Sequence, residues 1–281
     1  MSVRITTLSE NGVVPRPRGL LGEWGLSVLV ETNGLKVLLD AGQSVSAVNN
    51  GDILGVEWPS INAMVLSHGH YDHTGGLSAA LGETSARAIF VHPAAMTRKF
   101  AKRERPPYRS IGMPATSREA LNGLQERLVW TRAATEVVPG VWCTGEIPRT
   151  QKNETSAQSF FLDEEGHEPD PLLDDQALFV ETIRGLVIVA GCAHAGVVNT
   201  VNHVCKLAGR NEIHALIGGL HLGRASHKQL EETGSALGRL NFRILAPCHC
   251  TGMSAHAYLR ARFHSLVQDV GAGSSLVFDG R

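Results

Sequence analysis

The chain has 281 residues, of which 43% are hydrophobic and 19% are charged, and its formal net charge is −1. This composition is typical of a globular protein with an ordinary hydrophobic core. The balanced charge gives no overall field for nucleic acid or an acidic membrane surface, and no apolar run reaches the roughly 18 residues of a membrane span, so we expect neither partner.

The N-terminal sequence and the cysteines indicate the compartment. The first residues, MSVRITTLSENG, lack the apolar core of a secretory signal. Five cysteines are an odd number, which argues against a disulfide framework in a chain of this size. We therefore expect a reduced, cytoplasmic protein.

The first part of the chain predicts strands that alternate with short helices. Two apolar segments, 26–31 and 35–40, flank residues 32–34, where Asn-Gly supplies the left-handed backbone of a tight hairpin. Apolar runs at 61–67 and 88–91 predict two further strands. The other elements expected here are a short strand at 3–5 and helices at 44–54 and 77–84.

The segment 98–170 differs in character from its surroundings. Residues 98–109 carry six basic side chains and one acidic one, whereas 163–175 carry seven acidic ones. We interpret the segment as an insertion or lid on a single domain that includes the whole chain, 1–281. Two strands are expected inside it, at 127–130 and 136–143.

The second half is regular again and repeats the layout of the first. Segments 176–181 and 186–190 flank the turn at 183–185, and strand–helix units follow. A hairpin followed by such units predicts a layered α/β fold. The remaining elements are helices at 196–208, 226–240 and 254–268 and strands at 213–217, 242–246 and 275–278.

The hexapeptide HGHYDH follows an apolar run and concentrates ligand-type side chains. His68 and His70 are two residues apart, so on an extended backbone they point the same way. A sharp turn would bring Asp72 and His73 back toward a neighbouring point. Because imidazole and carboxylate bind zinc, manganese and iron, the hexapeptide predicts a metal site.

Three later histidines also follow apolar strands. His194, His221 and His249 each appear within a few residues of a predicted strand end. In layered α/β folds, strand ends on one edge of the sheet form the site, so we expect these side chains to converge with HGHYDH. Together these residues would suffice for two metal ions.

The combination of these motifs resembles the metallo-β-lactamase superfamily. The HxHxDH motif, the leading hairpin and the later histidines carry the resemblance. A dihydropterin-linked subgroup, named for a synthase of methanopterin precursors, is similar from about residue 19 to 277 through LLDAG, LSHGHYDHTGGL, GEIPR, DDQALFVE, VAGCAHAGVVNT, IGGLHLG and APCHCTG. The resemblance implies an α/β fold of four layers, an αββα sandwich, with a one- or two-metal site between its sheets.

The resemblance also implies a ligand set. His68 and His70 would hold the first metal ion, and Asp72 and His73 the second, which His249 would complete. The cofactors implied are divalent metal ions, two of them, and this set suits zinc, manganese or iron about equally.

The chain departs from the superfamily pattern at two ligand positions. Cys192 aligns with the strand-end Asp that bridges the metals, and His194, two positions on, is the candidate ligand there. The mid-chain His of the superfamily is absent. Asp174 and Asp175 stand near its place, so Asp175 is the candidate substitute.

Three roles stay open for His221: metal ligand, substrate contact, and hydrogen-bond donor to a ligand imidazole. We name His221 and Asp72 as catalytic candidates. Asp40 resembles a superfamily Asp that supports the ligand loop through hydrogen bonds, and we expect that role here.

The cysteines near the histidines have a simpler interpretation. Cys248 and Cys250 flank His249, and on an alternating strand both would point away from it. We therefore expect these two, and Cys192, to serve packing.

Candidate substrate contacts are basic or come from the resemblance. Arg105 and Arg109 in the basic stretch could clamp a phosphate, although such stretches are usually solvated. Glu146 and Arg149, in GEIPR, are candidates through the resemblance alone.

The main functional expectation is a metal-dependent hydrolase of an anionic small molecule, with an ester, lactone, thioester or phosphodiester as the bond attacked. One alternative is a transferase that joins a dihydropterin to a ribofuranosyl-aminobenzene phosphate. The other is a metal or ligand sensor without turnover, since one fold hosts many functions. A homodimer is also open.

Overall fold

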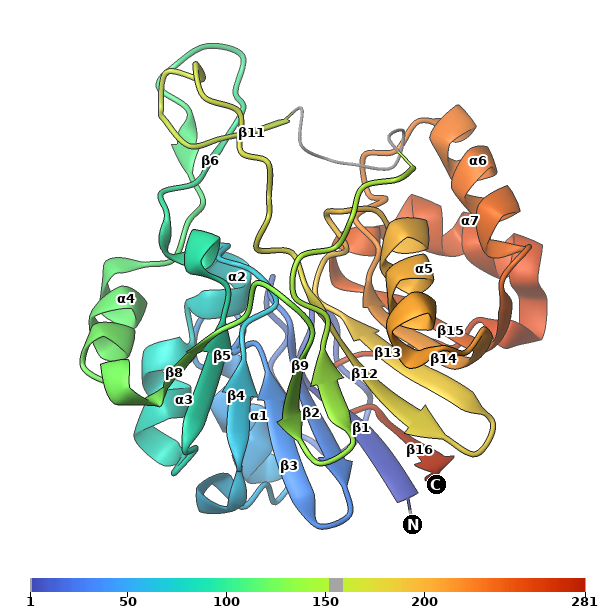
Figure 1. Ribbon diagram of the computed structural model, residues 1–281, viewed down its shortest axis with the longest axis horizontal. Coiled ribbons are helices and arrows are strands. Elements are labelled where there is room, and N and C mark those ends of the chain that lie inside the picture. The colour runs from blue at the N-terminus through green and yellow to red at the C-terminus, as the bar shows by residue number, and fades with distance from the viewer. Residues whose placement is uncertain (1, 152–158, 281) are drawn as a thin grey trace.

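The computed structural model describes residues 2–151 and 159–280, in which two β-sheets pack face to face between two layers of helices (Figure 1). This is the four-layer α/β sandwich expected from the sequence. In the described part of the chain, no helix is long and apolar enough to cross a membrane.

The first sheet contains seven strands, and its order places the N- and C-terminal strands side by side. Helices α1 (Ser46–Ile53), α3 (Leu77–Glu83) and α4 (Ala115–Asn122) cover its outer face with a cluster that includes Leu38, Met64 and Leu77. In spatial order the strands are β16 (Ser275–Asp279), β1 (Ser2–Ser9), β2 (Ser27–Thr32), β3 (Leu35–Leu39), β4 (Ala63–Val65), β5 (Ala88–Val91) and β8 (Leu128–Trp130).

The second sheet has six strands and is covered by the C-terminal helices. Helices α5 (Val197–Ala208), α6 (His227–Leu237) and α7 (Met253–Phe263) pack on its outer face through residues such as Val201, Leu237 and Leu259. In spatial order the strands are β15 (Asn241–Cys248), β14 (Glu212–Gly219), β13 (Gly185–Ala190), β12 (Ala177–Thr182), β10 (Val141–Cys143) and β9 (Thr135–Val138).

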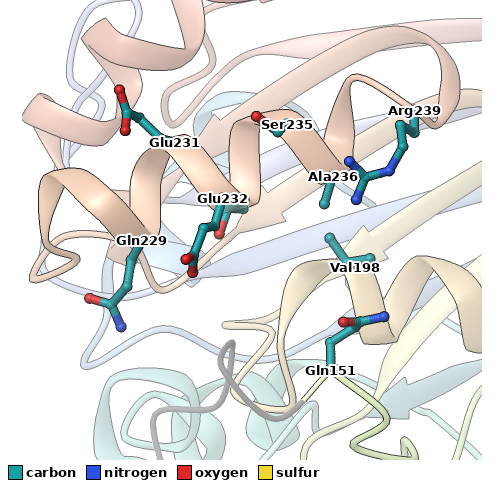
Figure 2. Close-up of a pocket in the computed structure, with 9 residues that line it drawn as sticks. Gln151, Val198, Gln229, Glu231, Glu232, Ser235, Ala236 and Arg239 are labelled. Carbon is teal, nitrogen blue, oxygen red and sulfur yellow. The ribbon is translucent and has the colours of Figure 1, made fainter.

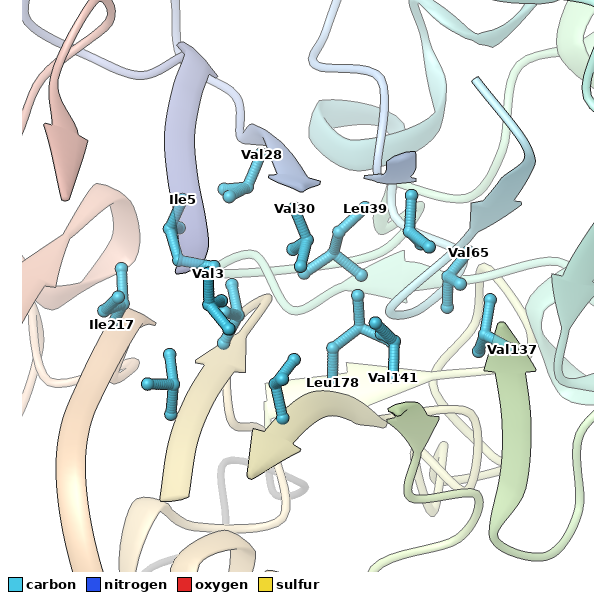
Figure 3. Close-up of a cluster of buried hydrophobic side chains, with 14 of the residues drawn as sticks. Val3, Ile5, Val28, Val30, Leu39, Val65, Val137, Val141, Leu178 and Ile217 are labelled. Carbon is cyan, nitrogen blue, oxygen red and sulfur yellow. The ribbon is translucent and has the colours of Figure 1, made fainter. Parts of the chain in front are cut away.

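The main core lies between the two sheets (Figure 3). Val28, Val30 and Leu39 of the first sheet face Val141 and Leu178 of the second, and all five are at most 2% exposed. Alternate residues of each strand point to this layer, whereas those between them point to the helices. This buried layer holds the strand ends, and therefore the loops that follow them, in place.

The local turn chemistry follows the sequence closely. Asn33 and Gly34 have φ values of 53° and 77°, as the hairpin between β2 and β3 requires. The expected strand at 136–143 is instead the hairpin of β9 and β10, because Gly140 has φ of 85° and reverses the chain. The expected helix at 254–268 ends earlier, at Phe263, since His264 has φ of 50°.

The expected insertion over 98–170 divides into two kinds of structure. Its middle part contributes α4, β8, β9 and β10 to the sandwich, so that part belongs to the core layers. Strands β6 (Phe100–Ala101), β7 (Arg109–Ser110) and β11 (Phe160–Phe161) form a separate small sheet that projects from the sandwich (Figure 1). We call residues 98–112 and 159–172 the cap.

Candidate metal centre

Four loops that follow strands bring the predicted histidines together. The loop after β4 carries His68 and His70 and continues into the short helix α2 (Tyr71–Thr74). The loops after β13, β14 and β15 carry His194, His221 and His249. The imidazole rings lie in mutual contact, with centroids of neighbouring rings 4.2–4.9 Å apart.

One half of the cluster is centred on His68. Its Nε2 atom lies 3.0 Å from Nδ1 of His70 and 3.3 Å from Nε2 of His194. All three side chains are buried. Residues from both sheets of the sandwich therefore meet at one point.

The other half is centred on His73. Its Nε2 atom lies 3.1 Å from Nε2 of His249 and 3.2 Å from Sγ of Cys192. Asp72 joins this half, because its Oδ2 atom lies 3.4 Å from Nε2 of His249. The structure thus brings together every histidine and the aspartate of the predicted HGHYDH–His194–His249 set.

Cys192 connects the two halves. Its Sγ atom lies within 4.8 Å of the ligand atoms of His68 and His194, and also of those of His73 and His249. A packing role was expected for Cys192, but its thiol occupies a position between two candidate metal sites, which makes it a candidate ligand as well. Burial raises the pKa of this thiol, but a coordinating metal deprotonates a thiol outright.

A third group contains Cys250. The ligand atoms of Cys192, His221 and Cys250 also lie within 4.8 Å of one another. Cys248 packs between the sheets as expected, but Cys250 does not follow the strand alternation, because His249 has φ of 51° and begins a 3₁₀ turn. That backbone turn directs Cys250 toward Cys192, which corrects the expectation of a packing role.

The expected support by Asp40 is present. Asp40 is fully buried, accepts hydrogen bonds from N and Oγ of Ser67, and places Oδ2 2.7 Å from Nδ1 of His73. A carboxylate on the far nitrogen of an imidazole fixes the ring and directs its other nitrogen toward the site. His249 has comparable support, because its backbone N–H donates to Glu10 and its Nδ1 lies 3.2 Å from Oδ1 of Asn11.

The protonation states and donor types fit a divalent metal. Burial and the neighbouring imidazoles lower the pKa of His68 and His194, and burial lowers the pKa of His70 to about 3, so these rings are neutral. Burial opposes ionisation of Asp72, but its hydrogen bond with His249 holds the pKa below the usual range. Among the described residues, Nε2 of His70 is buried without a hydrogen-bond partner. Neutral imidazoles, a carboxylate and a thiol are the donors that zinc, iron and manganese accept.

Asp175 contacts the loop that carries His194. Its Oδ2 atom accepts a hydrogen bond of 2.8 Å from the backbone N–H of Ala195, next to His194. Within residues 2–151 and 159–280, no group of mutually close ligand atoms includes it. Burial raises its pKa to about 6. Asp175 therefore supports the backbone beside His194 through Oδ2, while its Oδ1 atom is buried with no hydrogen-bond partner among the described residues, so its role as the substitute for the missing histidine stays a prediction.

His221 lies at the edge of the cluster. Its ring centroid is 4.3 Å from that of His194, and in the part of the chain that is described its Nδ1 atom is buried without a partner. It contacts Cys250 but shares no ligand group with His68 or His73. This position is compatible with a metal ligand in the group with Cys192 and Cys250, a substrate contact or a hydrogen-bond donor, and all three roles remain predictions.

The four candidate substrate residues are dispersed. Arg149 donates to the backbone oxygen of Leu172 at 2.7 Å, and Oε1 of Glu146 lies 3.0 Å from Nε2 of His92. The exposed Arg109 places its guanidinium 5.6 Å from the ring centre of Tyr71, inside the ligand hexapeptide. Arg105 is exposed in the cap. Among these four side chains, and within residues 2–151 and 159–280, only Arg109 contacts the histidine loop directly.

Two aromatic side chains flank the cluster, and sequence reasoning missed both. The Trp24 side chain is 49% exposed, and its ring lies 5.2 Å from the His249 ring. At the other end, the ring of Phe160, from β11 of the cap, lies 5.3–5.9 Å from those of His70, His194 and His221. Single aromatic residues in loops carry no periodic signal, so no pattern in the sequence places them beside the histidines.

A pocket with a volume of about 430 Å³ lies elsewhere, between α5 and α6 (Figure 2). Gln151, Val198, Gln229, Glu232 and Arg239 are among its lining residues. None of the described residues that line it belongs to the histidine cluster.

Comparison with known proteins agrees with this geometry. The sequence model of the metallo-beta-lactamase superfamily matches residues 25–249. The chain belongs to this superfamily. Among solved structures, the chain is similar to Tm1679, a metal-dependent hydrolase of the beta-lactamase superfamily. The two sequences are 29% identical, and the structures superpose with a TM-score of 0.79 over 98% of each chain.

Other superfamily relatives extend the comparison. The 7,8-dihydropterin-6-methyl-4-(beta-D-ribofuranosyl)-aminobenzene-5'-phosphate synthase of Methanocaldococcus jannaschii is 32% identical, over 99% of this chain and 97% of that protein. Igni18, a metallo hydrolase from Ignicoccus hospitalis, shares the fold with a TM-score of 0.58 at 14% identity and full coverage of both chains. The archaeal synthase, for which the subgroup suggested by the sequence motifs is named, is thus similar to this chain over nearly its whole length.

Proposed function

We propose that this chain is a metal-dependent hydrolase that acts on an anionic small molecule. One observation carries the proposal: the His68–His194 group and the His73–His249 group both include the Cys192 thiol. Two such groups with a shared ligand would hold two metal ions close together. Membership in the superfamily and the similarity to the hydrolase Tm1679 support the assignment.

Bound divalent metals would lower the pKa of water toward neutrality and polarise the oxygen of the bond under attack. The protein's own contribution is positional. Asp40 and Asn11 orient the rings of His73 and His249, and the ionised Asp72 can accept a hydrogen bond from the attacking water. The candidate bonds are phosphodiester, lactone and thioester bonds.

The anionic substrate is inferred from the cap. Arg109 lies over Tyr71 of the ligand loop, and Arg98 and Arg105 are exposed in the same cap. Guanidinium groups bind phosphate and carboxylate through paired hydrogen bonds. A small anion near the metal ions would therefore meet the guanidinium of Arg109, although the cap as a whole carries six basic and six acidic side chains.

A second candidate is a synthase that acts on a dihydropterin. The 32% identity to the archaeal synthase supports it, and so do the two aromatic side chains at the cluster. The half-exposed Trp24 offers a flat surface beside His249, and Phe160 covers the His70–His194 end. Flat heteroaromatic rings stack on such side chains.

Turnover in ¹⁸O-labelled water separates the candidates. We would supply the metal-loaded protein with bis-(p-nitrophenyl) phosphate, a lactone and a thioester, and separately with a ribofuranosyl-aminobenzene phosphate and a dihydropterin that carries a diphosphate leaving group. A hydrolase puts labelled oxygen into its product, whereas a synthase forms the joined product without label and releases pyrophosphate. Asp72→Asn should abolish turnover but retain binding, and Asp269→Asn, at an exposed ion pair, is the matched control. Binding without turnover of any of these compounds would favour the sensor and contradict the proposal.

A further inference from the structure

A buried lysine connects the cap to the ligand hexapeptide. Lys99 is 0% exposed, and its Nζ atom donates to Oδ2 of Asp170 at 2.8 Å and to Oδ1 of Asp174 at 2.9 Å. Both carboxylates are also buried. Burying a lysine is costly unless it is paired, and such pairs add little net stability compared with apolar packing. The arrangement therefore calls for an explanation other than stability.

The two carboxylates differ in what they hold. The second oxygen of Asp174, Oδ2, accepts a hydrogen bond of 2.8 Å from the backbone N–H of Gly69. Gly69 stands between His68 and His70. The second oxygen of Asp170, Oδ1, accepts instead from the backbone N–H of Leu172, at the end of the cap. Of the two carboxylates, Asp174 is the one that bonds both Lys99 and the backbone between His68 and His70.

Two backbone hydrogen bonds also connect Lys99 to the ligand hexapeptide. The carbonyl oxygen of Lys99 accepts from the N–H of Ile111, and the carbonyl oxygen of Ile111 accepts from the N–H of Tyr71, at 2.8 and 2.9 Å. The turn has little freedom to adapt, because a Cβ atom on Gly69 would lie 2.3 Å from the carbonyl oxygen of Ala95. The position of Gly69 is therefore set by close contacts on both sides.

Asp175, which follows Asp174 in the chain, supports the other loop of the His68 half of the cluster. Asp175 accepts a hydrogen bond from Ala195 N–H, beside His194, as described above. Asp174 and Asp175 thus hold the two loops that supply His68 and His194, whose Nε2 atoms are 3.3 Å apart. A shift of Asp174 would change the distance between these two rings.

We propose that Lys99 is a positioning residue of the metal centre, which fixes the Gly69 turn through Asp174 and so sets the geometry of His68 and His70. The inference rests on the proposed function, because it assigns that geometry to metal binding. Partners that hold ligand residues in this way typically contribute roughly 10–100-fold to metal affinity. Within residues 2–151 and 159–280, the hydrogen bonds and ion pairs of the Lys99 side chain go to Asp170 and Asp174 and not to a side chain of the histidine cluster.

The test compares variants that remove different parts of this arrangement. Zn²⁺ and Mn²⁺ affinities are measured by competition with a chromophoric chelator, on folded protein verified by circular dichroism. Lys99→Met should weaken affinity about 10–100-fold, and Lys99→Arg should restore most of it. Asp170→Asn removes the other lysine contact without touching Gly69, so it should change affinity less than about threefold. Equal losses in Lys99→Met and Asp170→Asn, or no loss in either, would overturn the proposal.

A second variant and a second measurement keep the proposal testable if Lys99→Met does not fold. If Lys99→Met does not fold, Asp174→Asn replaces it, and wild-type metal affinity in Asp174→Asn would overturn the proposal. In metal-free protein, amide hydrogen exchange at Gly69 should accelerate in either variant. The N–H of Ser67, held by Asp40 in the same loop, is the internal control and should be unchanged. Unchanged exchange at Gly69 would refute the positioning role, whereas failure of the wild-type protein to bind metal would refute the proposed function.

Discussion

Asp40 and His73 face each other at 2.7 Å between Oδ2 and Nδ1, and neither side chain is exposed. The contact lies where the two halves of the histidine cluster join, since the other nitrogen of His73 contacts both Cys192 and His249. Burial opposes protonation of His73, but Asp40 outweighs it and raises the pKa of the ring to about 9. Metal binding must then displace a proton, while the carboxylate keeps the ring in place.

Asp40→Asn should weaken metal binding without unfolding the protein. The amide retains the size of the carboxylate but loses the charge that orients His73, so metal affinity should fall roughly 10–100-fold. Competition with a chromophoric chelator measures the change. Asp269→Asn, at an exposed ion pair, is the control. Equal affinities in the two variants would show that Asp40 does not support the metal centre.

Cys192→Ser tests the thiol between the two halves. Cobalt-loaded wild-type protein should show a sulfur-to-cobalt charge-transfer absorption, because a coordinated thiol is a thiolate. The absorption should disappear in Cys192→Ser and persist in Cys205→Ser, which alters a partly exposed cysteine of α5. If it persists in Cys192→Ser but disappears in Cys250→Ser, the thiolate ligand is Cys250 and our assignment is wrong.

Gly191→Ala should destabilise the protein and lower its metal content. A Cβ atom there would lie 2.1 Å from Oγ and 2.4 Å from Cβ of Ser67, the residue that Asp40 holds. Such overpacking typically costs about 1–3 kcal/mol in the free energy of unfolding, measured by urea denaturation. In Gly82→Ala the added Cβ meets nothing within 4 Å in a helix, so stability should rise by up to about 1 kcal/mol. Equal effects of the two substitutions would contradict the packing argument.

Trp24→Ala tests the stacking surface invoked for the second candidate function. If a pterin ring packs on Trp24, loss of the indole should weaken binding of 6-methylpterin by about 1–3 kcal/mol, measured by calorimetry on metal-loaded protein. Trp130→Ala removes a comparably exposed tryptophan, 48% against 49%, from the distant edge strand β8. A similar loss in both variants, or none in Trp24→Ala, would argue against pterin binding at this surface.

The fold and most of the metal-ligand set follow from local sequence signals. Asn33-Gly34 specifies a hairpin on its own, and HGHYDH brings four ligand-type residues together within one turn. His194 and His249 were predictable because strand ends in a layered fold meet at one edge. These features depend on short stretches of chain, which a sequence displays directly.

The remaining features depend on backbone geometry that no local pattern displays. The expected alternation of Cys248, His249 and Cys250 fails because His249 adopts a left-handed conformation, as Ala193 also does beside Cys192. Strain of this kind is stored at functional sites and held by the surrounding structure. The place of Asp175 in the sequence does not show that one of its carboxylate oxygens accepts a hydrogen bond from the backbone N–H of Ala195. Lys99 lies in the basic stretch 98–109, and such a stretch predicts solvent-exposed side chains, whereas Lys99 is buried.

Elemental analysis of purified protein tests the central claim most directly. Wild-type protein made in unsupplemented medium should contain about two equivalents of zinc, manganese or iron in total. His68→Ala should lose metal, whereas His167→Ala, at an exposed histidine of the cap, should retain it. Wild-type protein without bound divalent metal, even after dialysis against zinc or manganese, would contradict the account.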